Sequence, residues 1–125
     1  MSTIHTKYSG YSAGSDEGKK YRAMLLYYVE SETATSITYR AILYVDVNSS
    51  VTASYSGTLN IAGAVYTGTC ETALGESTNV TCVNPPLKQF SKGETATTAT
   101  IQGSIASSSG SWTGESVTVS VAVPI

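Results

Sequence analysis

Apolar and polar residues alternate along several segments of this chain, and this repeat of two residues limits the fold more than any other feature. The clearest case is Ser36–Val47, where every second position is apolar: Ile37, Tyr39, Ala41, Leu43, Val45 and Val47. Residues 51–61 and 117–123 repeat the pattern. Successive side chains of a β-strand point to opposite faces of the sheet. The alternation therefore predicts strands with one face in a core and one face in solvent.

Residues 20–30 differ from these segments because they are apolar on both faces. Ala23 and Leu25 alternate with Met24 and Leu26. A strand that is apolar on both faces is typical of a position where both faces are covered. We expect this strand to lie in the centre of a sheet, or to have its outer face covered by another element.

Residues that favour turns separate the expected strands. Asn and Ser occur in residues 46–50, and Gly63 stands where a tight turn needs a positive φ. Pro85 and Pro86 cannot continue a central strand, and Ser and Gly fill residues 107–111 before the last strand. About seven or eight short strands without a helical segment predict an antiparallel, immunoglobulin-like β-sandwich. A chain of 125 residues has room for one such domain, over residues 19–125.

The N-terminal residues 1–18 are polar, small and rich in Ser and Gly, without a repeat of either period. We expect them to form an extended arm that packs on its own domain or on neighbouring subunits. A secretory signal needs an apolar stretch after a basic start, and this segment has none. We therefore expect synthesis in the cytoplasm without a signal peptide. No run of 18 apolar residues is present, so we expect no membrane span.

The composition indicates what kind of partner the surface can bind. Charged residues make up 13% of the chain, where about 25% is usual, and Ser and Thr are correspondingly frequent. Nine tyrosines stand against one Phe and one Trp. The net charge of −2 argues against nucleic acid, because phosphate binding needs clustered Lys and Arg. A surface of hydroxyl and phenol groups is instead common where proteins contact other proteins.

Cys70 and Cys82 flank a segment that we interpret as a long hairpin loop, with the two cysteines on adjacent strands. In that arrangement they can form a disulfide. The alternative is a pair of reduced thiols that pack as small apolar core residues, as in a protein that stays in the cytoplasm. We expect no metal site, since two cysteines and the distant His5 cannot complete a tetrahedral shell.

Catalytic residues are not expected either. His5 is the only histidine, and it lies in the polar arm rather than in an apolar strand. Nucleophilic catalysis needs a Ser or Cys beside a base, and no pair of carboxylates is brought together by the pattern. The sequence therefore predicts a protein that is not an enzyme and that binds no cofactor.

Several aromatic residues fall at positions that we expect to be exposed. Tyr28 and Tyr44 occupy the outward register of their strands, and Tyr8 and Tyr11 lie in the arm. We interpret these four tyrosines as subunit contacts, with core packing as the alternative for Tyr28 and Tyr44. Trp112 lies in a loop, where its ring can serve as a platform for a sugar.

The order of these features over residues 20–123 resembles small immunoglobulin-like virion proteins of tailed bacteriophages, which serve as minor tail, tail-tip or capsid-decoration components. The resemblance rests on the segments KKYRAMLLYYVE, TATSITYRAILYVDV, YSGTLNIAGAVYTGT, KQFSKGETATTATI and SSSGSWTGESVTVSVAVPI. It implies a structural component of the virion whose partners are other virion proteins and copies of itself. Virion proteins later meet an oxidising environment, where Cys70 and Cys82 can become bridged. The alternative function is an adhesin that binds host-surface glycans through loop aromatics.

Overall fold

A computed structural model describes residues 3–12, 18–49, 51–93, 97–108 and 115–125 of the chain. Within these residues it forms nine β-strands and no helix. The strands are β1 (His5–Tyr8), β2 (Tyr21–Glu32), β3 (Ser36–Val47), β4 (Ala53–Ile61), β5 (Ala64–Thr72), β6 (Asn79–Val83), β7 (Lys88–Ser91), β8 (Thr98–Ser107) and β9 (Ser116–Pro124). The prediction of an all-β protein is confirmed, although the structure has one or two more strands than expected because the arm contributes β1.

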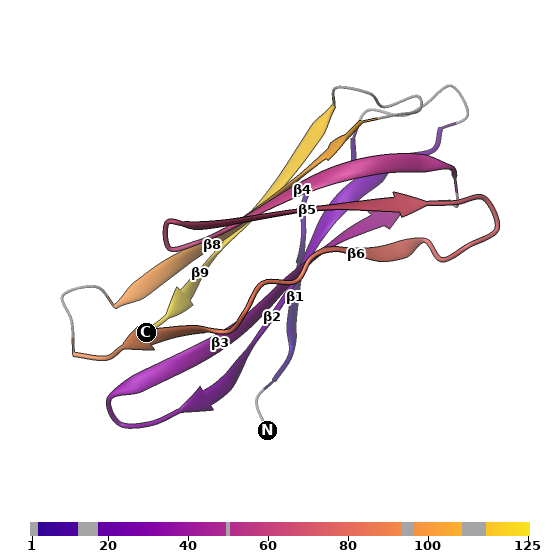
Figure 1. Ribbon diagram of the computed structural model, residues 1–125. Coiled ribbons are helices and arrows are strands. Elements are labelled where there is room, and N and C mark those ends of the chain that lie inside the picture. The colour runs from indigo at the N-terminus through magenta and orange to yellow at the C-terminus, as the bar shows by residue number, and fades with distance from the viewer. Residues whose placement is uncertain (1–2, 13–17, 50, 94–96, 109–114) are drawn as a thin grey trace.

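The strands form two antiparallel sheets that pack face to face (Figure 1). Sheet A has the order β1-β2-β3-β6, and β7 also pairs with β3. Sheet B has the order β5-β4-β8-β9. The chain passes from sheet A to sheet B after β3, returns after β5, and crosses again after β7. This arrangement of two antiparallel sheets around one core is that of a β-sandwich.

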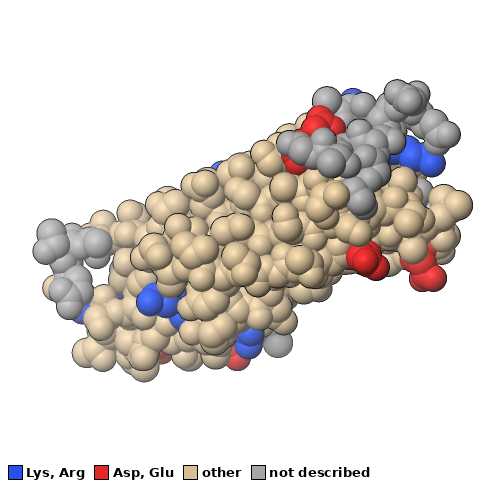
Figure 2. All heavy atoms as spheres, turned by 45° about the horizontal axis from the view of Figure 1, so that its top comes forward, with Lys and Arg blue, Asp and Glu red and all other residues tan. Residues whose placement is uncertain are grey.

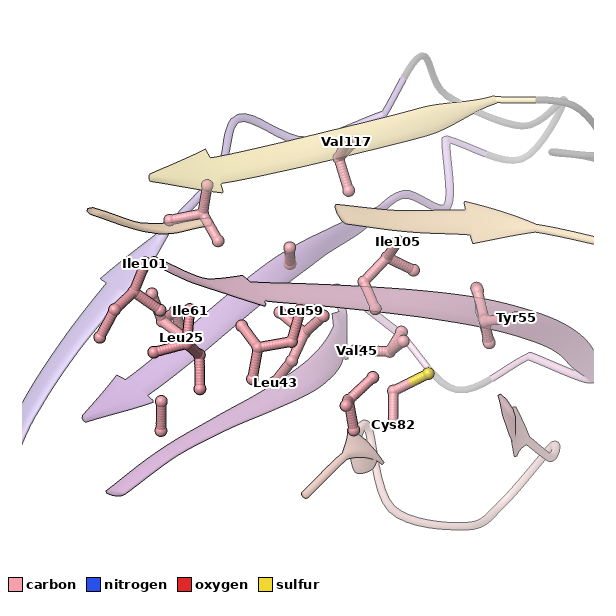
Figure 3. Close-up of a cluster of buried hydrophobic side chains, with 14 of the residues drawn as sticks. Leu25, Leu43, Val45, Tyr55, Leu59, Ile61, Cys82, Ile101, Ile105 and Val117 are labelled. Atoms are coloured by element: carbon pink, nitrogen blue, oxygen red, sulfur yellow. The ribbon is translucent and has the colours of Figure 1, made fainter. Parts of the chain in front are cut away.

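The core lies between the sheets and follows the predicted alternation. All six apolar residues that alternate along β3 are buried. Side chains from sheet B, including Leu59, Ile101 and Ile105, meet Leu25 and Leu43 of sheet A in this layer (Figure 3). The strand over residues 20–30 is central, as predicted, because β2 lies between β1 and β3.

The turn between β4 and β5 confirms the expectation for Gly63. Ala62 and Gly63 have φ values of 51° and 95° and connect two strands that pair down to Ile61 and Ala64. Two consecutive residues with positive φ are typical of the tight hairpin turn that matches the twist of antiparallel strands. The amide side chain of Asn60 accepts a hydrogen bond from the Gly63 N–H at 2.8 Å, which holds the turn.

The Pro85–Pro86 pair divides one edge of sheet A into two short strands. β6 pairs with β3 at Leu43–Asp46, and β7 pairs with it at Ser36–Tyr39. Between them the guanidinium of Arg40 donates to the Asn84 side chain at 3.4 Å and to the Pro85 carbonyl at 3.3 Å. A side chain of β3 thus connects the two strands where proline cannot donate to the sheet.

The expectation that Cys70 and Cys82 flank a hairpin loop is wrong. Cys70 lies on β5 of sheet B, and Cys82 lies on β6 of sheet A, so the intervening segment joins the two sheets. β5 and β6 are edge strands of the two sheets, and they approach closely at Gly68 of β5. Gly68 is paired with Gly57 of β4. A Cβ atom at Gly68 would lie 2.1 Å from the carbonyl oxygen of Cys82. The close approach of β6 to β5 therefore requires a glycine at this position.

Tyr21 connects the core to the end of the sandwich. Its hydroxyl donates to the Glu115 carbonyl at 2.6 Å and accepts from the Ser107 N–H at 3.3 Å. Its ring packs at 60° against that of Tyr55, with 5.3 Å between the ring centroids. Burial of the side chain raises the pKa of Tyr21 from 10.0 to about 12.

This raised pKa predicts a loss of stability in alkali. Below pH 10 Tyr21 is protonated in both the folded and unfolded chains, so its contribution is fully present. As the pH rises from 10 to about 12, the unfolded chain loses this proton first, and the free energy of unfolding falls. Urea denaturation at several pH values should show a shallower loss of stability in Tyr21→Phe than in the unaltered chain. Equal slopes for the two proteins would contradict this assignment. Part of the loss should persist in Tyr21→Phe, because burial also raises the pKa values of Tyr39 and Tyr55.

Candidate functional site

The outer face of sheet A carries a group of apolar and aromatic side chains that we call the outer patch. It consists of Met24, Leu26 and Tyr28 on β2 and of Ile42 and Tyr44 on β3. Leu26 pairs directly with Ile42, and Met24 pairs with Tyr44, so these side chains lie side by side across the two strands. All five are half-buried, on the side of the sheet that faces away from the core. Tyr28 and Tyr44 are therefore not packed between the two sheets.

The arm packs on its own domain over the residues that the structure describes. β1 pairs with β2 from His5 opposite Tyr27 to Tyr8 opposite Met24. Further along, the Ser9 N–H donates to the Ala23 carbonyl at 3.0 Å, and the Ser9 hydroxyl accepts from the Ala23 N–H at 2.9 Å. The Ser12 hydroxyl accepts from the Tyr21 N–H at 3.1 Å. The arm was expected to pack on its own domain or on neighbouring subunits, and in the single chain it packs on its own domain. The sequence did not predict β1, because all four of its residues are exposed and leave no apolar repeat.

Arg22 holds the arm through what we call the arm clasp, formed by Arg22, Tyr8, Tyr11 and Asp46. The guanidinium carbon lies 3.8 Å from the ring centroid of Tyr8 and 4.6 Å from that of Tyr11. The Nε atom of Arg22 lies 2.8 Å from a carboxylate oxygen of Asp46, which fixes the guanidinium beside the rings. Cation–π contacts of this kind contribute about 0.5–2 kcal/mol each. The structure thus brings Tyr8 and Tyr11 together, while Tyr28 and Tyr44 lie in the outer patch of the same sheet.

The outer face of sheet B is different because it carries rows of hydroxyl groups. Thr67, Thr58, Ser104 and Thr118 face one another across the four strands. The Ser104 and Thr118 hydroxyls lie 3.0 Å apart. In Figure 2 most of the visible surface is formed by uncharged residues, and the acidic and basic side chains gather near its rim. The side of the molecule seen in Figure 2 is therefore formed mainly by uncharged side chains.

A pocket of about 300 Å³ lies between the end of sheet A and β9. His5 and Tyr27 stack at one wall with 5.1 Å between their ring centroids. Val29, Tyr39 and the end of β9 form the remaining lining, and the Tyr39 hydroxyl donates to the Pro124 carbonyl at 2.6 Å. The sequence does not predict this pocket, because its residues come from four strands whose order in space no pattern in the sequence indicates.

The two cysteines are free thiols near the edge where the sheets meet, and the Cys82 sulfur lies 3.8 Å from the carbonyl oxygen of Gly68 on β5. The interaction between the two thiols lowers the pKa of Cys82 and raises the pKa of Cys70. Burial adds to the rise at Cys70. Cys82 is 7% exposed, and Cys70 is more accessible. Formation of a disulfide between them stays a prediction.

Trp112, the expected sugar platform, lies outside the described residues. Within those residues no three His, Cys, Asp or Glu side chains are grouped so that they could bind a metal. The described part of the chain also contains no helix of the length and hydropathy needed to cross a membrane. Comparisons with protein families, with curated proteins and with solved structures find no significant match for this chain.

Proposed function

We propose that this chain is a non-enzymatic structural component of a bacteriophage particle, a capsid-decoration or minor tail protein that binds neighbouring virion subunits. The observation that carries the proposal is β1, an exposed strand at the edge of sheet A. It is held by backbone hydrogen bonds, the arm clasp, the stacking of His5 on Tyr27 and a hydrogen bond from Lys7 to the Ser120 carbonyl. The resemblance of residues 20–123 to small virion proteins supports it. An immunoglobulin-like sandwich with an extended N-terminal arm is part of the same proposal.

The arm can bind a neighbouring subunit by the contacts that it makes within its own chain. Exchange of an identical element between copies replaces each intramolecular contact by the same intermolecular one, so it changes the contact energy little. β1 buries none of its four residues, and its removal from β2 therefore opens no cavity in the core. The loss of conformational freedom on binding is offset best when many copies are held close together, as in a particle.

The outer patch is the second element of the proposed contact. Its five side chains lie directly beside β1, since Tyr8 pairs with Met24 and Thr6 pairs with Leu26. Half-buried aromatic and aliphatic groups without charge are typical of the centres of protein interfaces. A neighbouring subunit that received the arm would therefore also lie against the outer patch.

Particles from the source strain test the function directly. We expect an antibody against the chain to detect it in purified particles, in a fixed ratio to capsid or tail proteins, when a lysate is banded on a density gradient. A chain with residues 1–18 deleted should be lost from the particles while it remains soluble in the lysate. A chain that is present in the lysate but absent from every particle fraction would overturn the proposal.

The arm mechanism makes a separate prediction for Arg22. A labelled peptide of residues 1–12 should bind to a chain that lacks these residues, and fluorescence anisotropy measures its affinity. Arg22→Ala in the shortened chain should weaken binding roughly tenfold, because the peptide loses its two cation–π contacts. The affinity of the Arg22→Lys variant should lie between that of the shortened chain with Arg22 and that of Arg22→Ala, since lysine keeps the charge but not the planar guanidinium. Equal affinity for all three shortened chains, each with an unchanged far-UV spectrum, would contradict the arm clasp.

Glycan binding is the second candidate function, and the observation that favours it is the aromatic wall of the pocket. The stacked rings of His5 and Tyr27 present a surface of the kind on which sugar rings pack. A glycan array with the unaltered chain, Tyr27→Ala and Trp112→Ala distinguishes the functions. Binding that is lost in either variant favours an adhesin, and no binding by any of the three leaves the structural function as the proposal.

A further inference from the structure

Cys70 and Cys82 meet at the corner where the edge of sheet B touches the edge of sheet A. The thiol of Cys82 lies 3.8 Å from the carbonyl oxygen of Gly68 on β5. Gly68 and Cys70 are alternate residues of β5, so both are oriented toward the inside of the sandwich. Cys82 thus lies against the part of β5 that carries Cys70, on the side of that strand to which Cys70 is oriented.

The surroundings of the pair favour reaction between the two sulfurs. Cys82 points into the core between β4 and β6, over the space left by Gly57, and is almost inaccessible to solvent (Figure 3). Cys70 is partly accessible. A reagent in solution can therefore reach Cys70, whereas Cys82 is reached best from Cys70. The neighbouring Cys70 also lowers the pKa of Cys82, which favours its thiolate, the form that attacks a disulfide.

We propose that Cys70 and Cys82 form a reversible disulfide that links sheet A to sheet B, made by exchange with a low-molecular-weight disulfide such as oxidised glutathione. This site is independent of the proposed virion function. The linkage joins β5 to β6 and closes the loop of residues 71–81 into a ring. It acts as a covalent bond between two sheets whose edges at this corner share no ladder of paired residues.

The reaction needs two exchange steps. Cys70 is the accessible thiol, and it must first lose its proton to solvent at mildly alkaline pH, because Cys82 and burial raise its pKa. The Cys70 thiolate then attacks one sulfur of oxidised glutathione, the glutathione S–S bond breaks, and one glutathione thiolate leaves. The Cys82 thiolate then attacks the Cys70 sulfur of the mixed disulfide and displaces the second glutathione thiolate. The two thiolates that leave take up the two protons that the cysteines released. The protein loses two electrons in total, and glutathione disulfide gains them.

Intact mass measurement tests the proposal on the full chain. Reduced protein is incubated with oxidised and reduced glutathione at mildly alkaline pH, and free thiols are then blocked with N-ethylmaleimide. We expect a monomer lighter than the reduced protein by two hydrogen atoms, with neither cysteine blocked. Retention of two blocked cysteines, a stable glutathione adduct or a covalent dimer as the main product would each overturn the proposal.

Two single variants test the order of the steps. Cys82→Ala should accumulate the mixed disulfide at Cys70, because no second thiolate is present to displace glutathione. Cys70→Ala should stay unmodified while it is folded and should react only in urea, because Cys82 is buried. Equal rates of modification for both folded variants would contradict the role given to Cys70.

Thermal unfolding gives an independent measurement. The oxidised chain should unfold at a temperature higher by about 10 °C than the reduced chain, since the bond restricts the unfolded state. Cys70→Ala should unfold at the same temperature with or without oxidised glutathione. An unaltered chain whose unfolding temperature is also the same under both conditions would overturn the link between the sheets.

Discussion

Replacement of Gly68 by alanine should lower the free energy of unfolding by about 3 kcal/mol or more. The added Cβ would lie 2.1 Å from the carbonyl oxygen and 3.2 Å from the carbonyl carbon of Cys82. Both atoms belong to the main chain of β6, which is held by its pairing with β3. The clash therefore cannot be relieved by rotation of a side chain, and one sheet edge has to move away from the other. Urea denaturation measures the change.

Two further glycines provide a graded control for this experiment. At Gly57 the nearest atom to an added Cβ is the Cys82 sulfur at 2.8 Å, the end of a side chain that can shift. At Gly10 nothing lies within 4 Å of the added atom. We expect the losses to decrease in the order Gly68, Gly57, Gly10, with the last within about 0.5 kcal/mol of zero. A Gly68→Ala chain as stable as Gly10→Ala would show that β6 does not lie against β5 in solution.

Leu43→Ala should lower the free energy of unfolding by about 3–4 kcal/mol, within the usual range for a buried leucine. Leu43 is fully buried in the middle of β3 and pairs with Leu25 and Val83. Its side chain reaches across the core to Gly103 of sheet B, where an added Cβ would lie 2.5 Å from the Leu43 Cδ1 atom. Since Gly103 has no side chain that could move into the space, truncation of Leu43 leaves a cavity between the sheets.

Ile42 is the matched control because it precedes Leu43 on the same strand and points to the opposite face. Ile42→Ala in the isolated chain should lower the free energy of unfolding by about 1 kcal/mol, as for a side chain that is only half-buried. In an assembly, the same variant should weaken association between subunits, since Ile42 belongs to the outer patch. Equal losses of stability for the two variants would contradict the assignment of the core and outer faces of sheet A.

The parts of the fold that the sequence predicted are those that depend only on the residues within a single strand or turn. The strand over Ser36–Val47 has the predicted bounds, and its six apolar residues are buried, because alternation within a strand depends only on which face meets the core. The turn at Gly63 was also predicted, since a positive φ is a property of one residue and its neighbours.

The parts that the sequence did not predict depend on which strands become neighbours. The segment between Cys70 and Cys82 is compatible in length and composition with a hairpin loop, and only the strand order shows that it crosses between the sheets. The arm clasp requires β1 to pair with β2, so that Tyr8 lies next to Arg22. No pattern within residues 1–18 indicates this pairing.

The same distinction applies to the candidate sites. The outward positions of Tyr28 and Tyr44 follow from their registers and were predicted, and the pairing of β2 with β3 then places them in one patch. The pocket combines His5 and Tyr27 with residues of β9 that are distant from both in the chain. The alternation of apolar and polar residues within a strand does not indicate which distant strands contact each other.

The proline pair between β6 and β7 has a consequence for the behaviour of the protein at high concentration. An uninterrupted edge strand offers its backbone groups to other chains and can seed fibrous aggregates. Here β6 and β7 have five and four residues, and neither Pro85 nor Pro86 has an amide hydrogen to donate. The outer edge formed by these strands is therefore a poor template for indiscriminate strand addition. The prolines should thus limit aggregation of the chain at high concentration.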